Sequence, residues 1–262
     1  MSGNDFVVVR SRGPASDLHE RPVPDPATPA IWWHDVTSPA LVLGSAQDQS
    51  VVDAAACRAA GVDVIRRRSG GGAVLLLPGE VVWFDVIVPL AGTGGPGHGP
   101  MSDIRRSMVW LGERLRDVMG RGTVHDGPLV ATPWSRTICF DGIGPGELVV
   151  DGAKLVGISQ RRTRHAARFQ VCAHTSYDPS ALPALLRPGH RPPTDVLRPV
   201  ALIDDATAGT LPELLRTTVA TTPPPPSPPT PPPPSPPTPP RDPRRAGGGV
   251  TGMCGGEMGE DG

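Results

Sequence analysis

The sequence predicts an α+β fold in which a mixed, largely antiparallel sheet is flanked by helices. Apolar, β-branched runs follow one another through tight turns at residues 68–72, 78–79 and 151–152. Turns this short favour antiparallel pairing over the longer crossovers that parallel strands need. Between the runs, residues 103–119 repeat apolar side chains at every third or fourth position, which is typical of a helix that buries one face.

Short segments are predicted as strands where β-branched and other apolar residues dominate and turn residues bound them. Residues 6–9 are placed at an edge of the sheet, and residues 12–29, rich in Pro, Asp and Ser, are predicted to be a loop. The predicted strands span residues 6–9, 30–35, 40–44, 62–67, 73–77, 80–89, 137–140, 147–150, 154–160 and 167–174.

Helices are predicted where a capping side chain precedes an apolar pattern or a glycine ends it. Ser50 and Gly61 bound an alanine-rich helix. Ser102 and Gly120 bound the long amphipathic one, and Asp178 caps a short one. The predicted helices span residues 51–60, 103–119, 178–186 and 211–219.

Composition divides the chain into three parts. Residues 1–29 are predicted to be an N-terminal strand and loop, residues 30–220 one globular domain, and residues 221–262 a Pro- and Gly-rich tail. About 220 residues before the tail are enough to bury a single sizeable core. Proline-rich sequence prefers polyproline II or disorder and cannot pack a core, so the tail is predicted to be a disordered appendage.

Charge and cysteine usage exclude several classes of protein. The net charge is −1, which gives no basic field for nucleic acid or a membrane surface. The N-terminus lacks the pattern of a signal peptide, and no apolar run is long enough to span a membrane. Four cysteines lie far apart without a Cys-x-x-Cys pair, which predicts reduced thiols and a cytoplasmic protein.

The Arg–Gly stretch, residues 64–74, reads Val-Ile-Arg-Arg-Arg-Ser-Gly-Gly-Gly-Ala-Val. Arginines and bare backbone N–H groups at one turn could hold a phosphate or carboxylate, although a solvated basic turn is the simpler alternative. It is no P-loop, because it lacks the Gly-Lys-Ser/Thr ending and runs into a strand. Residues 92–97 fit G-x-G-x-x-G only formally, since no helix can start in that Pro-Gly sequence.

The lysine motif, residues 151–160, reads Asp-Gly-Ala-Lys-Leu-Val-Gly-Ile-Ser-Gln. Lys154 is the only lysine among residues 1–220, which contain many arginines. A lysine carries a compact charge that can reach between a carboxylate and a phosphate, so Lys154 is a candidate catalytic residue. The alternative is a solvated lysine that follows a hairpin turn.

Together the two stretches resemble the lipoate–protein ligase A family of the biotin/lipoate A/B protein ligase superfamily. Residues 66–74 resemble the family signature, and residues 151–160 resemble its Gly-x-Lys-x-x-Gly-Ser-Ala/Ser-Gln motif, in the expected order and at about the expected distance. The resemblance covers about residues 30–200. It implies that residues 30–220 adopt the biotin/lipoate ligase catalytic-domain fold.

The resemblance also implies a reaction. With ATP and Mg²⁺, the carboxylate of lipoate or octanoate would form an acyl-adenylate, and Lys154 would stabilise the charge that develops. The acyl group would then pass to a lysine of a carrier domain on a 2-oxoacid dehydrogenase or a glycine-cleavage protein. The residues implied to bind the adenylate are Arg67, Ser69, Gly70, Gly71, Gly72, Ala73 and Gly157.

Other roles are open alternatives. Glu147 is a candidate carboxylate beside magnesium, or else a surface acid at a strand end. Val74, Val82 and Phe84 are candidates for the walls of an acyl tunnel, or else plain core.

Departures from the family pattern bear on the substrate and the partners. Leu-Leu-Leu at residues 75–77 stands where members often have His-Asp, and residues 169–174 lack the usual Gln-His-Gly run. The sequence also offers nothing to build a C-terminal accessory domain, so a separate accessory chain is a candidate partner.

Two alternative functions follow from the same residues. A branch of the superfamily transfers octanoyl from acyl carrier protein through a cysteine thioester, and Cys139-Phe140 resembles its Cys-Phe pair. Lys154 could supply the positive charge that activates such a thiolate. The three-glycine turn resembles the ligase more than the Thr-Gly-Gly of the transferase, so ligation is preferred. The second alternative is a non-catalytic protein that binds lipoyl groups or carrier domains.

Deletion of residues 222–262 should leave folding and activity unchanged, because a proline-rich tail contributes no packed core. Thermal melting and acyl transfer by the truncated chain, compared with the full chain, test this expectation. A lower melting temperature or lost activity would show that the tail has a role.

Overall fold

The computed structural model describes residues 5–90, 101 and 103–221. The predictions made for residues 91–100, for Ser102 as a helix cap and for the Pro-rich tail therefore lie outside the described residues. Within them, no helix is long and apolar enough to cross a membrane.

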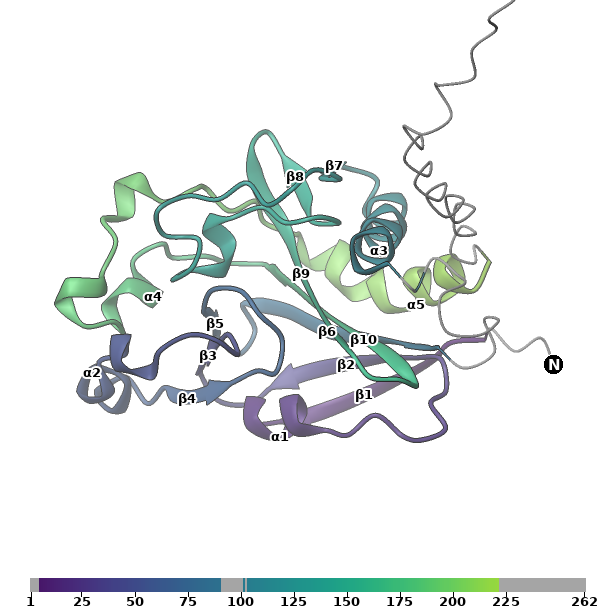
Figure 1. The fold of residues 1–262 in the computed structure, drawn as a ribbon, viewed down its shortest axis with the longest axis horizontal. Coiled ribbons are helices and arrows are strands. Elements are labelled where there is room, and N and C mark those ends of the chain that lie inside the picture. The colour runs from purple at the N-terminus through teal and green to yellow at the C-terminus, as the bar shows by residue number, and fades with distance from the viewer. Residues whose placement is uncertain (1–4, 91–100, 102, 222–262) are drawn as a thin grey trace, which may run out of the picture. The chain divides into compact units, whose positions relative to one another are not determined.

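Two sheets and five α-helices make up the regular structure of the described residues (Figure 1). The helices are α1 (Ala15–Glu20), α2 (Ala54–Ala59), α3 (Ile104–Met119), α4 (Ala181–Ala184) and α5 (Asp205–Thr221). The strands are β1 (Val7–Gly13), β2 (Ala30–Val36), β3 (Ala40–Leu43), β4 (Asp63–Arg66), β5 (Val74–Leu76), β6 (Val81–Pro89), β7 (Thr123–Val124), β8 (Leu148–Val150), β9 (Ala153–Arg162) and β10 (Ala166–His174).

The larger sheet has the strand order β1-β2-β6-β10-β9-β8-β7, and the smaller one has the order β4-β3-β5. In the larger sheet only β1 and β2 run parallel, and every other neighbouring pair is antiparallel. The predicted fold class, α+β with a mixed and largely antiparallel sheet, is confirmed. The turn at residues 151–152 joins β8 to β9 as predicted, with positive φ at both Asp151 and Gly152.

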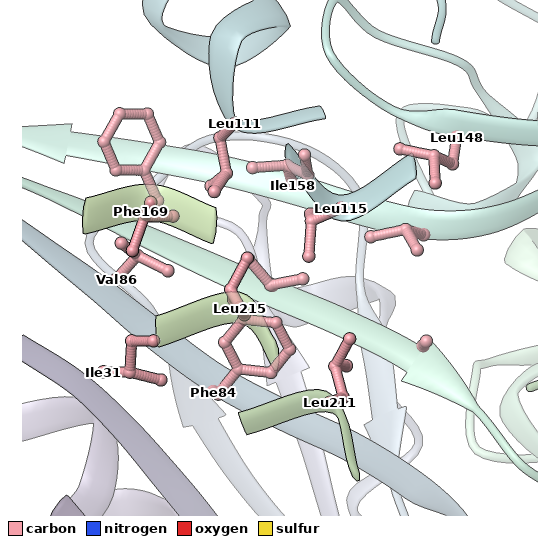
Figure 2. Close-up of a cluster of buried hydrophobic side chains, with 14 of the residues drawn as sticks. Ile31, Phe84, Val86, Leu111, Leu115, Leu148, Ile158, Phe169, Leu211 and Leu215 are labelled. Carbon is pink, nitrogen blue, oxygen red and sulfur yellow. The ribbon is translucent and has the colours of Figure 1, made fainter. Parts of the chain in front are cut away.

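The main core lies between one face of the larger sheet and helices α3 and α5, which lie next to each other (Figure 1). Alternate residues of β6 and β10 point into it, because successive side chains of a strand face opposite sides. Figure 2 shows how the sheet residues interdigitate with leucines from the two helices. Its labelled members are Ile31, Phe84, Val86, Leu111, Leu115, Leu148, Ile158, Phe169, Leu211 and Leu215.

Helix α3 begins one residue later than the predicted bound and is capped by Asp103, whose Oδ1 accepts a hydrogen bond from the backbone N–H of Arg106 at 2.9 Å. It ends at Gly120, as predicted, where φ is 66°. Glycine adopts this left-handed conformation without the steric cost that a Cβ brings.

The smaller sheet faces the opposite side of the larger one. Val42 of β3 and Leu76 of β5 pack with Trp83 of β6 in one cluster. Leu41 and Leu43 point the other way, into a second cluster with α2 and α4. Strand β3 is buried on both faces, which is why its sequence is a continuous apolar run.

The predicted hairpins at residues 68–72 and 78–79 are wrong. Strands β4 and β5 do not pair, because β3 lies between them and pairs with both, parallel to β4 and antiparallel to β5. Strands β5 and β6, joined by residues 78–79, belong to different sheets. A tight turn joins segments that are near in space, but only the apolar faces decide which strands become neighbours.

Two further segments differ from prediction. Residues 12–29 were expected to be a loop, yet they contain the end of β1 and helix α1. Residues 137–140 are no strand: Cys139–Asp141 form a 3₁₀ turn, and Ile138 makes a single bridge to Ala73.

The bounds of three helices also differ from prediction. Helix α2 begins after Asp53, whose carboxylate accepts from the N–H groups of Ala55 and Ala56, rather than after Ser50. Helix α4 is a single turn after Ser180, and α5 starts at Asp205, six residues before the predicted residue 211. Carboxylates accept from the free N–H groups of a first turn, and Asp53 is close enough to do so.

Replacing Leu111 of α3 with alanine should lower the free energy of unfolding by about 2–5 kcal/mol, because its side chain is fully buried in the main core. Ile104 on the same helix is 60% exposed, so Ile104→Ala serves as a control with a change of about 0.5 kcal/mol or less. Urea denaturation of both variants measures the difference. Equal losses would contradict the placement of this core.

Candidate functional site

The Arg–Gly stretch, the lysine motif and residues 137–147 meet on the face of the larger sheet that looks toward the smaller one. Backbone hydrogen bonds hold two of them together: Ala73 N–H donates to Thr137 O at 2.8 Å, and Cys139 N–H donates to Ala73 O at 2.9 Å. The lysine motif lies on β9, whose Lys154 reaches back to residues 139–147. The predicted site residues are therefore brought together.

The guanidinium of Arg67 shapes the turn from inside. Its Nη2 donates to the carbonyl oxygens of Gly70 and Gly72, both at 2.8 Å. Its Nη1 is 3.4 Å from the carbonyl oxygen of Val42. Arg67 is buried, and no carboxylate of the described residues lies within ion-pair distance of it. Arg67 is one of the residues implied to bind the adenylate, and in the structure its guanidinium donates to backbone carbonyls and so stabilises the turn.

Glycine is required at two positions of the turn. Gly71 has φ 102°, a left-handed conformation that other residues rarely adopt. A Cβ at Gly72 would lie 2.6 Å from the carbonyl carbon of Ile138, which is too close for any side chain. The bare backbone of the turn therefore packs against residues 138–139.

Lys154 is almost completely buried and has an acceptor for each of its three protons. Its Nζ lies 2.8 Å from Glu147 Oε1, 2.9 Å from Cys139 O and 3.1 Å from Gly142 O. Burial, the largest single effect, opposes the charge, but the Glu147 carboxylate and Cys139 together outweigh it and keep the pKa of Lys154 above its usual value. The alternative of a solvated lysine is wrong.

Glu147 is a buried partner of Lys154, so the alternative of a surface acid is wrong. Its Oε2 accepts from Gly144 N–H at 2.6 Å, and its Oε1 accepts from Ile158 N–H at 3.2 Å as well as facing Lys154. Both carboxylate oxygens are thus committed to donors, an arrangement that does not fit a magnesium ligand. Among the described residues, no group of three or more His, Cys, Asp or Glu side chains could hold a metal ion.

Two cavities join at Cys139. The first, which we call the polar cavity, has an empty volume of about 1430 Å³, open solvent included. The second, the apolar cavity, has about 430 Å³. The polar cavity is lined by Gly70, Gly71, Gly72, Glu147 and Lys154 among others; the apolar one by Val42, Val74, Leu76, Trp83, Phe140 and Gly157 among others.

Three residues line both cavities: Cys139, Ile158 and Ser159. A ligand with an anionic head and an apolar tail could lie across this junction, with the head over the glycine turn. Of the predicted tunnel walls, Val74 lines the apolar cavity, whereas Val82 and Phe84 belong to the main core. Ala73 is buried beside the turn and lines neither cavity.

A chain of polar side chains forms one wall of the apolar cavity. Ser69 Oγ lies 3.0 Å from Ser159 Oγ and 3.0 Å from Gln170 Oε1. Gln170 Nε2 in turn lies 3.0 Å from His19 Nδ1. Ser69, expected to bind the adenylate, therefore links the turn to β9 and β10.

His19 is a site residue that sequence reasoning missed. It comes from α1, in a segment predicted to be a loop, and its ring lies 4.4 Å from that of Trp83. Burial lowers the pKa of His19 to about 3, so it is neutral at physiological pH. No local pattern marks it, because only the packing of α1 against the sheet brings it to the cavity.

Beneath this wall lies a buried charge cluster. Arg168 Nε donates to Asp85 Oδ2 at 2.8 Å, and His34 Nε2 lies 3.0 Å from the same oxygen. Asp85 is fully buried; burial raises the pKa of its carboxyl, but hydrogen bonding and charge from His34 and Arg168 outweigh this and hold it below the usual value. Arg168 also donates to the carbonyl oxygens of Leu18, His19 and Arg21, and so fixes α1 to the sheet.

Comparison with protein families supports one superfamily. The model of the lipoyl protein ligase A/B catalytic domain matches residues 18–221. This match includes the end of α1 from Leu18 on, and with it His19, which the sequence resemblance over about residues 30–200 did not reach. A comparison with curated protein sequences finds no match.

Solved structures of lipoate ligases share the fold. A bi-partite lipoate protein ligase with its E2 lipoyl domain, from Thermoplasma acidophilum, has a TM-score of 0.57 and 15% identity over 84% of each chain. Lipoate-protein ligase A bound with ATP has a TM-score of 0.52 and 17% identity, covering 84% of this chain and 85% of that one. LipL1 from P. falciparum, in complex with lipoate, has a TM-score of 0.53 and 13% identity over 82% of this chain and 62% of its own. The predicted biotin/lipoate ligase fold is thus confirmed.

Acid should destabilise the protein through its buried neutral histidines. Burial lowers the pKa of His19 to about 3 and that of His174 to about 4, from 6.5. Below pH 6.5 the unfolded chain binds protons that the folded chain does not, so stability falls as pH falls, by up to about 1.4 kcal/mol per pH unit for each histidine.

Between pH 6.5 and 4.5, the free energy of unfolding measured by urea denaturation should therefore fall less steeply with falling pH for His19→Gln than for the wild type. His190 is exposed, so the variant His190→Gln serves as a control: it removes a histidine but leaves every buried histidine in place. If the free energy of unfolding of His19→Gln changed with pH as steeply as that of the control, a neutral, buried His19 would be contradicted.

Proposed function

Because the chain belongs to the lipoyl protein ligase A/B catalytic domain family, whose members are enzymes of the ligase or transferase type, we propose that it is a lipoate–protein ligase. It activates lipoate or octanoate with ATP and transfers the acyl group to a lysine of a carrier domain. The observation that carries the proposal is the junction of an apolar cavity with a larger polar one beside Lys154 and the glycine turn.

In the first step the acyl tail occupies the apolar cavity and the carboxylate lies at the junction. The carboxylate oxygen attacks the α-phosphorus of ATP, and pyrophosphate leaves. The glycines of the turn line the polar cavity, and their backbone N–H groups are candidate donors to the phosphate oxygens. Positive charge on Lys154 and Arg67, one on either side of Cys139, favours the anionic adenylate there.

Lys154 contacts the reacting oxygens when a substrate oxygen takes the place of one of its three hydrogen-bond acceptors. Its three protons are bonded to Glu147 and to the carbonyls of Cys139 and Gly142. A substrate oxygen can replace one carbonyl, and the gain from a charged acceptor exceeds the loss of a neutral one. Any Mg²⁺ that accompanies ATP would be held by the phosphates, because the described residues provide no ligand set.

In the second step the amine of the acceptor lysine attacks the acyl carbonyl, and AMP leaves. The acceptor we propose is a lipoyl carrier domain of a 2-oxoacid dehydrogenase or a glycine-cleavage protein. A similar structure holds a bi-partite ligase and its E2 lipoyl domain, which supports both this acceptor and a separate accessory chain. The near-neutral charge and separated cysteines support a cytoplasmic setting.

One observation favours a second candidate, octanoyl transfer from acyl carrier protein. Cys139 lines both cavities, so its thiol lies where an acyl carbonyl would lie. Its carbonyl is bonded to Lys154, which fixes the residue against a cation. In this route the thiolate attacks the donor thioester, the carrier thiol leaves, and the acceptor lysine then attacks the new thioester on Cys139.

The two routes differ in the donor that they require. We expect the full chain to modify an apo carrier domain with lipoate or octanoate only when ATP is present, as detected by intact-mass spectrometry. The double variant Lys154→Met/Glu147→Gln removes both buried charges together and should lose about a hundredfold or more in rate while remaining folded.

Three results would change the assignment. Modification from octanoyl acyl carrier protein without ATP, abolished by Cys139→Ala and kept by Cys57→Ala, establishes the transferase; Cys57 is buried in the second core, away from the site. No modification from either donor, with octanoate still bound, leaves the non-catalytic binding protein. Full activity in the folded double variant would remove Lys154 from the reaction.

A further inference from the structure

A third cavity lies behind the first two. We call it the distal cavity; its empty volume is about 410 Å³. It shares Val74 and Phe140 with the apolar cavity, just as the apolar and polar cavities share Cys139. The three cavities therefore follow one another: polar, apolar, distal.

Phe140 is the larger of the two side chains that separate the apolar and distal cavities. It is 3% exposed, and its ring edge is 3.4 Å from the position that a Cβ on Gly157 would take. The ring centroid lies 5.0 Å from the Nζ of Lys154, which lines the polar cavity. On the distal side it meets the edge of the His174 ring, with centroids 4.6 Å apart.

The distal cavity is lined by both apolar and polar side chains. Ile138 and Leu182 are buried, whereas Ser176 and Asp178 are exposed, so the polar end of the cavity is the end open to solvent. His174 Nε2 is buried and has no hydrogen-bond partner among the described residues, and Tyr177 packs against its ring at 5.0 Å. An aromatic ring held by edge contacts, rather than by hydrogen bonds, can be replaced without leaving a polar group unsatisfied.

We propose that the distal cavity is an acyl-binding compartment closed by the Phe140 ring, so that Phe140 sets the length of the acyl chain that the site accepts. The proposal rests on the proposed function, which places the acyl tail in the apolar cavity. A medium chain ends against the ring. A longer chain meets the ring and is rejected, although an apolar compartment of similar size lies behind it.

Removal of the ring joins the two compartments. Added methylenes of a longer chain would then lie against Ile138, Leu75 and Val74 instead of in water, which favours binding. The chain end would stop before the polar end of the cavity, since the carboxylate of Asp178 there disfavours an apolar tail.

The preference for acyl chain length can be measured by direct binding, without ATP, carrier domain or catalytic turnover. Isothermal titration of the full chain with octanoate and with dodecanoate gives the ratio of the two dissociation constants. We expect the wild type to favour octanoate, and Phe140→Ala to shift the ratio toward dodecanoate by roughly tenfold or more. Phe140→Leu keeps more of the packing and should shift it in the same direction by less.

Two further variants distinguish binding in the distal cavity from a general loosening of the protein core. Phe169→Leu, in the main core (Figure 2), should leave the ratio unchanged. Leu77 lines the distal cavity, so Leu77→Trp fills it and should cancel the gain in the Phe140→Ala background.

Unchanged ratios in both Phe140 variants, or a wild type that binds neither acid, would overturn the proposal. So would a gain that Leu77→Trp fails to cancel. A wild type that binds octanoate but modifies no carrier domain refutes the proposed function alone, and the ratios still decide the role of Phe140.

Discussion

The buried ion pair between Lys154 and Glu147 is the interaction on which the geometry of the site depends. Lys154 lies on β9, whereas its three acceptors all come from residues 139–147. One ammonium therefore fixes the segment that carries Cys139 to the sheet. A buried pair is stable only when every donor and acceptor is satisfied, and here backbone carbonyls and N–H groups complete both partners.

The need to satisfy every buried donor and acceptor explains why residue 154 is a lysine and residue 67 an arginine. An ammonium can direct three protons toward three separate acceptors, as Lys154 does. A guanidinium is a planar fork, and Arg67 uses it to bind two carbonyls of one turn side by side. This explains why one lysine persists in a domain that otherwise uses arginine, and why Arg67 shapes the cradle instead of reaching out of it.

Local sequence patterns predicted where strands and helices lie better than they predicted which strands pair. The alternation of β6 and β10 and the one-faced spacing of α3 follow from residues near in sequence, and both were found. The sharing of β3 between β4 and β5 depends on distant apolar faces, which no turn residue encodes. Likewise the motifs pointed to Lys154 and the glycine turn, but His19 reaches the site only through Arg168, which holds α1 from another strand.

Ligation and transfer make the same electrostatic demand at one point of this site. Under the proposed function, an acyl carbonyl at the junction of the cavities would develop negative charge in either route, whether the group beside it is an adenylate phosphate or a cysteine sulfur. Lys154 and Arg67 place positive charge around that point in both cases. In the function that we propose, the two cations would therefore stabilise the reacting group in either route, and the choice between ATP and a thioester donor would depend on what occupies the polar cavity and on the thiol of Cys139.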